Sequence, residues 1–237
     1  STLYLAFSAG IPSPLTEFPI QFGDFAVWQK QWLSGEILEN QLNYWKQKLD
    51  GAPQQLNLPI DHPRTPVMTF KGKQESFEFN AELTQKLKKL TLRSGATLYM
   101  TLLAAFKVLL CYYSQQEDIV VGSPISNRNS KQIESLIGIF INTLVIRTDL
   151  SGNTTFLELL SRLRKNCLQA YEHQDVPFQQ VITELNIERD PSLPPLVQAA
   201  FIFQNTPNFS LEMPNLTINK VKIKSQAAKT DLTLSME

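Results

Sequence analysis

The stretch that decides the fold reads Ile137-Gly138-Ile139-Phe140-Ile141-Asn142-Thr143. Its apolar residues continue as Leu-Val-Ile, which predicts a strand over residues 140–146. Asn142 lies among apolar neighbours, where a buried polar side chain needs a hydrogen-bond partner. We interpret Asn142 either as a residue that faces a reaction or as a buried amide that satisfies local backbone groups. Gly138 is expected to permit close approach of the backbone.

Helical and strand patterns alternate around this stretch. Asn80 and Gly95 are predicted to cap the two ends of one helix, and Thr155 and Glu158 to form the capping box of another that ends near Tyr171. This alternation is typical of an α/β sandwich. Further helices are predicted over residues 3–9, 22–49 with a break near Ser34-Gly35, and 97–110, and strands over residues 75–79, 118–121, 198–203 and 216–224 with a bulge near Asn219-Lys220.

Four prolines follow the second predicted helix. Their fixed φ angles and missing N–H donors predict an extended linker over residues 51–66. We place a lobe boundary at this linker, so that residues 1–66 and residues 67–237 belong to different parts of the fold. The prolines are Pro53, Pro59, Pro63 and Pro66.

The composition is that of an ordinary globular protein, with 43% hydrophobic and 19% charged residues. Lys+Arg and Asp+Glu both total 22 and the basic residues are dispersed, so no net field favours nucleic acid or an anionic membrane as a partner. The apolar run over residues 98–113 contains Thr101 and Lys107 and is too short to cross a bilayer. Cys111 and Cys167 are interpreted as buried free thiols in a reducing cytoplasm.

The signatures of other enzyme classes are missing from the sequence. It has no Gly-x-Gly-x-x-Gly, no Walker loop, no Cys-x-x-Cys and no nucleophile elbow. Two histidines are too few for a His-rich metal site. The chain opens on Ser1 and closes on Glu237 within strand-like alternation, so we expect both ends to be cut from a longer protein.

Three further motifs accompany the first stretch. They read Phe22-Gly23-Asp24-Phe25-Ala26-Val27-Trp28, His173-Gln174-Asp175-Val176-Pro177-Phe178 and Arg189-Asp190-Pro191-Ser192. In order and spacing, the four motifs resemble the successive core motifs of the condensation domain of nonribosomal peptide synthetases, over nearly the whole chain. That family's catalytic motif, His-His-x-x-x-Asp-Gly, does not occur in this sequence. The resemblance places it just before Ser1, so we expect no catalytic residue in this chain.

The resemblance implies one lobe of a chloramphenicol acetyltransferase-like fold, a two-layer α/β sandwich with a mixed sheet flanked by helices. Residues 1–66 would be a remnant of the N-terminal lobe and residues 67–237 the C-terminal lobe. The intact domain would join an aminoacyl or peptidyl thioester to an aminoacyl amine, in the biosynthesis of a secondary metabolite. Both substrates would arrive on phosphopantetheine arms of carrier domains, without a metal or a bound cofactor. The other partners would be an adjacent adenylation domain and the missing lobe, in the cytoplasm.

Five residues are candidates for the tunnel or the lobe interface through this resemblance. Asn142 and Gly138 would lie near the tunnel, and Gln204 and Asn205 would follow a strand that lines it. Arg128 follows a buried strand, and the resemblance implies that it pairs with the Asp of the absent catalytic motif. A bidentate Arg–carboxylate pair suits such an orienting role. The alternative is a surface arginine after a turn.

Eight residues are expected to have architectural roles. His173 and Asp175 follow the last turn of a helix, where a histidine interacts favourably with the terminal carbonyls, so we do not assign them to acid–base catalysis. Pro177 ends this segment and Phe178 anchors it. The others are Asp24 as a helix cap or charge partner, Trp28 as a packing anchor together with Trp32 and Trp45, Arg189, and Asp190 as a bridge to Arg189 or to a neighbouring backbone group.

Two other classes of protein stay open. The chain could belong to another acyltransferase of the same superfamily, such as an epimerisation, cyclisation or ester-forming domain, which the upstream sequence would distinguish. It could instead be a non-catalytic lobe that docks a carrier domain. Within the condensation family, the motifs resemble most the subtype that accepts an L-configured donor. The fragment alone is expected to be inactive in condensation.

Overall fold

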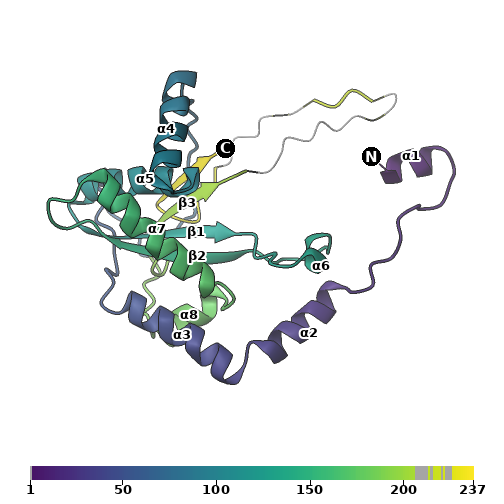
Figure 1. Ribbon diagram of the computed structural model, residues 1–237, viewed down its shortest axis with the longest axis horizontal. Coiled ribbons are helices and arrows are strands. Elements are labelled where there is room, and N and C mark those ends of the chain that lie inside the picture. The colour runs from purple at the N-terminus through teal and green to yellow at the C-terminus, as the bar shows by residue number, and fades with distance from the viewer. Residues whose placement is uncertain (1, 206–212, 214–215, 220, 222–225) are drawn as a thin grey trace.

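Four strands form the centre of the fold in the computed structural model (Figure 1), which describes residues 2–205, 213, 216–219, 221 and 226–237. They lie in the order β2-β1-β3-β4 across one sheet. β1 pairs antiparallel with β2, whereas β1–β3 and β3–β4 are parallel pairs, so the sheet is mixed. The strands are β1 (Asp118–Ile125), β2 (Asn142–Asp149), β3 (Ala199–Phe203) and β4 (Leu232–Met236).

Helices flank this sheet, which confirms the predicted α/β class. α5 contacts β1 and α7, α7 contacts β2, and α3 contacts α8, which also contacts β2. Their apolar faces share one core with the strands, in which Leu103, Leu163 and Phe201 are fully buried. The helices are α1 (Thr2–Ser8), α2 (Phe22–Trp32), α3 (Gly35–Leu49), α4 (Ala81–Ser94), α5 (Leu98–Ser114), α6 (Lys131–Glu134), α7 (Phe156–Glu172) and α8 (Phe178–Glu184).

The ends of α4 and α7 follow the predicted capping residues. Asn80 Oδ1 accepts a hydrogen bond from Leu83 N at 2.8 Å, and Gly95 closes α4 with a left-handed φ of +63°. Thr155 and Glu158 form the predicted capping box at the start of α7. These ends are confirmed because hydrogen bonds between near neighbours in sequence determine them.

The strand predicted over residues 75–79 is wrong, because this segment forms no strand. Phe77 and Phe79 are exposed, and their rings contact one another with centroids 5.6 Å apart. A strand needs a neighbour to pair its N–H and C=O groups. In the described part of the chain, the nearest pairing in sequence is the isolated bridge between Lys71 and Ala227.

Two other strand predictions have different outcomes: the bounds of one are wrong, and much of the other lies beyond the described residues. β2 begins at Asn142 and not at residue 140, since Phe140 packs into a separate apolar cluster. Much of the strand predicted over residues 216–224, including the bulge at Lys220, lies outside the described residues. Leu216 itself forms an isolated bridge with Met213.

The three tryptophans differ in their burial. Trp45 is only 3% exposed and belongs to the main core. Trp28 and Trp32 are 52% and 36% exposed, and their rings stack on each other with centroids 5.5 Å apart. The expectation that all three anchor the core is therefore wrong for the two that lie on α2.

Helix α3 and the first half of the proline-rich linker pack against the sheet. Leu42 and Leu49 of α3, together with Leu56 of the linker, belong to the same core as the strands. Gln198 Oε1 accepts a hydrogen bond from Leu56 N at 2.8 Å, and the Gln198 amide donates to Gln54 O at 3.2 Å. This part of the linker is thus bound to Gln198, directly before the start of β3. The lobe boundary near residue 66 stays a prediction.

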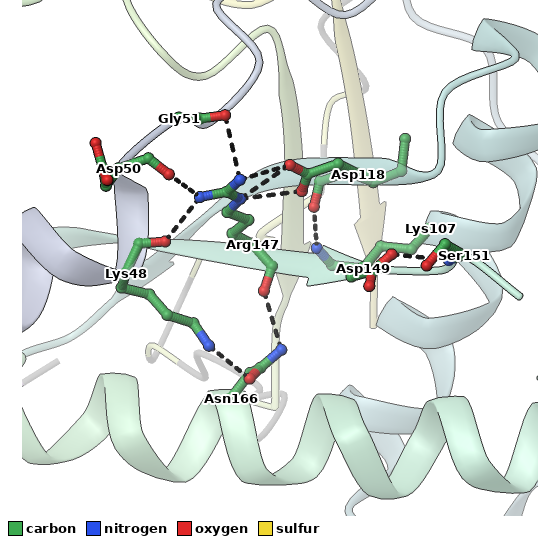
Figure 2. Close-up of polar contacts among 10 residues, drawn as sticks. Lys48, Asp50, Gly51, Lys107, Asp118, Arg147, Asp149, Ser151 and Asn166 are labelled. Carbon is green, nitrogen blue, oxygen red and sulfur yellow. Dashed lines mark hydrogen bonds and ion pairs between the residues drawn. The ribbon is translucent and has the colours of Figure 1, made fainter.

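Arg147 of β2 connects the end of α3 to the sheet (Figure 2). Its guanidinium donates to both carboxylate oxygens of Asp118 on β1, at 2.8 to 3.1 Å. The same group donates to Lys48 O at 3.2 Å, Asp50 O at 2.5 Å and Gly51 O at 3.2 Å. Carbonyls at a helix end have no partner within the helix, and Arg147 supplies donors to one in the last turn of α3 and to the two that follow Leu49. The same side chain neutralises a carboxylate.

Asn166 of α7 extends this connection to a third element. Its amide donates to Arg147 O at 3.0 Å, and its Oδ1 accepts a hydrogen bond from Lys48 Nζ at 2.7 Å (Figure 2). Burial and the positive charge of Arg147 lower the pKa of Lys48. Helices α3 and α7 and strand β2 are therefore joined by one polar network.

Helix α5 buries a lysine in the core. Lys107 has no exposed surface, and its Nζ donates to Ile119 O of β1 at 2.8 Å and to Ile146 O of β2 at 2.5 Å. Burial lowers the pKa of Lys107 to about 7. In the described residues, no single helix is long and apolar enough to cross a membrane; α4 and α5 reach the required length and composition only as a pair bent by 105°.

Replacing Arg147 tests the connection between α3 and the sheet. We expect Arg147→Met to lower the free energy of unfolding by about 2–3 kcal/mol, because it leaves the Asp118 carboxylate and three carbonyls without their donor. Urea unfolding would measure the loss. Lys46→Met is the matched control, since it breaks an ion pair with Glu184 whose side chains are 45% and 37% exposed, and we expect it to cost less than about 1 kcal/mol. Equal losses in the two variants would contradict the assignment.

The pH dependence of stability tests the buried lysine. The folded chain binds the Lys107 proton less tightly than the unfolded chain, whose lysine keeps a pKa near 10.5. Unfolding therefore takes up a proton between about pH 7 and 10.5, and this group makes stability rise with pH by up to about 1.4 kcal/mol per pH unit. Urea unfolding between pH 7.5 and 9 should show a smaller slope in Lys107→Met than in the parent chain. The exposed control Lys88→Met should keep the parent slope, and an unchanged slope in Lys107→Met would overturn the expectation.

Candidate functional site

Asn142 binds the turn that carries the His-Gln-Asp-x-Pro-Phe motif. Its amide nitrogen donates to Gln174 O and to Val176 O, both at 2.8 Å. Its Oδ1 accepts hydrogen bonds from Thr143 N at 2.9 Å and from Phe178 N at 3.0 Å. Asn142 is 8% exposed, and these four bonds use its full hydrogen-bonding capacity. The geometry favours the interpretation as a buried amide that satisfies local backbone groups.

The same turn is bound on its other side by α3. Gln41 and Asp175 form a reciprocal pair, in which Gln41 Nε2 donates to Asp175 Oδ2 at 3.0 Å and Asp175 N donates to Gln41 Oε1 at 3.2 Å. The indole of Trp45 donates to His173 O at 2.8 Å. Residues 173–178 therefore join α3 to the start of β2.

His173 follows the last residue of α7, and its imidazole ring makes two contacts. Nδ1 is 2.8 Å from Gln169 O, and because a carbonyl can only accept, Nδ1 carries the hydrogen. The imidazole stacks on the ring of Tyr44, with centroids 3.9 Å apart and an interplanar angle of 10°. Burial raises the pKa of Tyr44 to about 12. These contacts fit the architectural role expected for His173.

Arg128 organises the loop that leads to β2. Its Nη1 donates to the carbonyls of Ile133 and Glu134, and its Nη2 donates to Gly138 O at 3.4 Å. The guanidinium also lies over the ring of Phe140, 4.1 Å from the centroid. These contacts leave N–H donors free at Nε and Nη2 for a further acceptor.

Gly138 and Asp24 lie in the same region, around the start of α2. A Cβ built on Gly138 would come within 2.2 Å of the Phe22 ring, so only glycine fits there without a shift. The predicted close approach is thus made by a side chain and not by backbone. Asp24 Oδ2 accepts a hydrogen bond from Gln21 N at 2.8 Å within a capping box.

The remaining candidates lie apart from this region. Gln204 and Asn205 are exposed at the end of β3, where Gln204 N donates to Met236 O at 2.8 Å. Asp190 Oδ1 accepts a hydrogen bond from Ser192 N at 2.7 Å, and hydrogen bonding with Ser192 lowers the pKa of Asp190. Asp190 therefore bonds to a neighbouring backbone group and not to Arg189.

The structure thus divides the predicted residues into two groups. Asn142, His173, Asp175 and Phe178 meet at one turn, and Arg128 lies with Gly138 at the adjoining loop. Gln41 and Trp45 complete the turn, and the sequence pattern had not marked their contacts. A cavity of about 370 Å³ lies between α3 and α8, and none of the predicted site residues lines it. In the part of the chain that the structure describes, no group of three or more His, Cys, Asp or Glu side chains gathers as a metal site.

Known proteins resemble this chain along its whole length. One of the proteins that make up the linear gramicidin synthase of Brevibacillus parabrevis is 50% identical over 237 residues, covering 99% of this chain and 5% of that protein. The X-domain from teicoplanin biosynthesis has a TM-score of 0.90 at 26% identity, covering 100% of this chain and 54% of the X-domain chain. The structure of that X-domain in complex with OxyB has a TM-score of 0.89 at 27% identity and also covers 100% of this chain, with 52% of the other chain.

The chain therefore spans about half of a solved relative and a small part of a curated one. The Condensation domain family matches residues 1–237. This match extends over all four motifs, and the mixed sheet flanked by helices agrees with the fold of the solved relatives. The chain belongs to the condensation domain family of nonribosomal peptide synthetases.

Proposed function

We propose that this chain is part of a condensation domain that forms an amide bond between a donor thioester and an acceptor amine. The observation that supports the proposal most is the family match over residues 1–237, which includes the motifs at Asn142 and at residues 173–178. In this proposal both substrates arrive on phosphopantetheine arms of carrier domains in the cytoplasm. An adenylation domain adjoins the domain, and the C-terminal lobe begins near residue 67.

An exposed apolar row supports the idea that further protein covers this chain. Ile137, Ile139 and Ile141 alternate along one extended segment and are 87%, 83% and 70% exposed. Large exposed apolar surfaces mark interaction sites. In the proposed domain, the second lobe covers this row and brings the catalytic His beside it.

Arg128 has a specific role in this proposal. It is half-buried, and it keeps free N–H donors beside the exposed row. We assign these donors to the Asp of the upstream catalytic motif, whose loop they would orient. Asn142 does not contact the substrates in this proposal. It holds in place the turn over residues 173–178, which helps to form the wall of the tunnel.

A second candidate function is a binding lobe without chemistry of its own. The observation that favours it is the similarity to the X-domain, which was solved in complex with OxyB. In this alternative the chain docks a protein partner or a carrier domain. The upstream sequence separates the two functions, since amide formation needs the catalytic motif there, and another motif in its place would indicate a different acyltransferase.

Loaded carrier proteins test the proposed chemistry. We expect the intact domain, with the residues before Ser1, to form dipeptidyl product from one aminoacylated donor and one aminoacylated acceptor carrier. The 237-residue chain alone should form none above background. Mass spectrometry of the acceptor arm would measure the product. Product formed by the chain alone would show that its catalytic groups lie within it, and no product from the intact domain would leave the binding lobe as the better function.

Replacing Asn142 in the intact domain tests its role as a clamp. We expect Asn142→Ala to slow amide formation while the domain still folds, and to lower the free energy of unfolding by about 2–4 kcal/mol, because two buried carbonyls and two backbone N–H groups lose their partner. Single-turnover kinetics and urea unfolding would measure the two effects. Asn153→Ala, at an exposed position, is the matched control and should change neither. A slower reaction with unchanged stability would assign Asn142 to the chemistry, and unchanged kinetics would reduce it to packing.

A further inference from the structure

The second half of the proline-rich linker and the residues after it lie along the segment that leads into β4. Gly72 N donates a hydrogen bond to Gln226 O at 2.8 Å. Ala228 N donates to Phe70 O, also at 2.8 Å. A Cβ built on Gly72 would lie 2.5 Å from the Cβ of Ala228, so the two segments are in direct contact here. We name residues 64–72 the strap.

An ion pair joins the first residue of the strap to the start of β4. Arg64 Nη1 donates to Asp231 Oδ1 at 2.9 Å, and Arg64 Nη2 donates to Asp231 Oδ2 at 2.5 Å. This bidentate fork fixes the carboxylate in direction as well as in distance. The two side chains are 25% and 22% exposed, so the pair is partly shielded from water. Asp231 directly precedes Leu232, the first residue of β4.

The strap is also bound to the Arg-Asp-x-Ser motif. Met68 N donates a hydrogen bond to Pro191 O at 2.9 Å. Hydrogen bonding with Ser192 and, more weakly, the positive charge of Arg64 lower the pKa of Asp190. The strap therefore has an attachment that does not involve β4, and Arg64 offers the strand an anchor.

β4 needs such an anchor because its own pairing leaves its register open. In the part of the chain that the structure describes, β4 pairs with β3 alone. Leu234 and Met236 pack against the main core, whereas Thr233 and Ser235 are exposed. A slip by one residue would exchange these two faces, but a slip by two residues would keep the same faces in place. The longer slip would move the Asp231 carboxylate by about 7 Å, which the fork does not allow.

The position of β4 reaches the other end of the sheet through one hydrogen bond. Gln204 follows the last residue of β3, and its N donates to Met236 O at 2.8 Å. The five residues of β4 rise about 16 Å, so this bond and the fork lie at opposite ends of the strand. Gln204 and Asn205 are the residues that the resemblance to condensation domains assigns to the tunnel.

We infer that Arg64 is a positioning residue, whose fork on Asp231 fixes the register of β4 and thereby the place of Gln204 and Asn205. Arg64 acts through the strand and touches no substrate. Its importance for amide formation rests on the proposed function, in which Gln204 and Asn205 face the tunnel. The register of β4 does not rest on that function.

Hydrogen exchange in the intact domain, followed by mass spectrometry, tests the register. We expect Arg64→Met to speed exchange about fivefold in peptides that cover residues 199–205 and 232–236, because the β3–β4 pair loses its anchor. Peptides from β1 and β2 should keep the parent rate. Arg64→Lys keeps the charge but loses the fork, so it should give an intermediate rate. Exchanging the two residues, as Arg64→Asp with Asp231→Arg, restores an ion pair and should slow exchange toward the parent rate.

The matched control is Lys73→Met, directly after the strap. Lys73 pairs with Glu75, and the two side chains are 86% and 77% exposed. Such a pair contributes little, so we expect parent exchange in every peptide.

Single-turnover amide formation with loaded carrier proteins tests the consequence for the reaction. Arg64→Met should slow the reaction about fivefold or more, in step with the faster exchange of residues 199–205, and the exchanged pair should recover both. Lys73→Met should react at the parent rate.

Two exchange results would overturn the register role. Exchange at residues 199–205 could stay unchanged in Arg64→Met, or it could rise equally in all four strands, which would make the pair a general stabiliser. A parent rate of amide formation together with faster local exchange would remove Arg64 from the positioning of the tunnel. Because exchange uses no substrate, faster local exchange in a domain that forms no amide would reject the proposed function and keep the register role.

Discussion

The fold around the site depends on the four hydrogen bonds of one buried amide. Asn142 begins β2, and its side chain holds three backbone groups of the turn between α7 and α8. A buried backbone group without a partner costs more than a satisfied one gains, so this position tolerates few side chains. Through the turn, Asn142 also determines where Asp175 and His173 meet α3. Motifs far apart in sequence thus share one hydrogen-bonding unit.

Polar side chains connect the sheet to α3, α5 and the proline-rich linker, in positions where apolar side chains could also pack. Lys107 bonds to carbonyls of both central strands, Arg147 satisfies the last turn of α3, and Gln198 binds the linker. Lys107 and Gln198 are buried and Arg147 is partly buried, and each has its partners in place, which is the condition under which buried polar groups specify one arrangement. They fix how α3, the linker and the sheet lie relative to one another, which apolar contacts alone do less specifically.

How much the sequence could predict follows from the range of the interactions involved. Asn80, Thr155 and Gly95 were predictable because each helix end depends on residues three or four positions away. The strand over residues 75–79 was wrong because alternation does not show whether a neighbouring strand exists. Asn142 could be singled out as a polar residue in an apolar run, but its partners in the turn could not, since they lie more than 30 residues away. The contacts of Gln41 and Arg147 left no local pattern at all.

The packing of α3 has a consequence for recombination between synthetases. A crossover in the proline-rich linker would take α3 from one parent and the sheet from another, and it would separate Trp45 from the carbonyl of His173 and Gln41 from Asp175. The exchanged halves would then have to match at both pairs and at the Arg147 contacts. A crossover between α2 and α3 leaves all of these contacts within one parent, so chimeras joined at Gly35 inherit every buried residue of the main core and have to match only where α2 packs on Phe140.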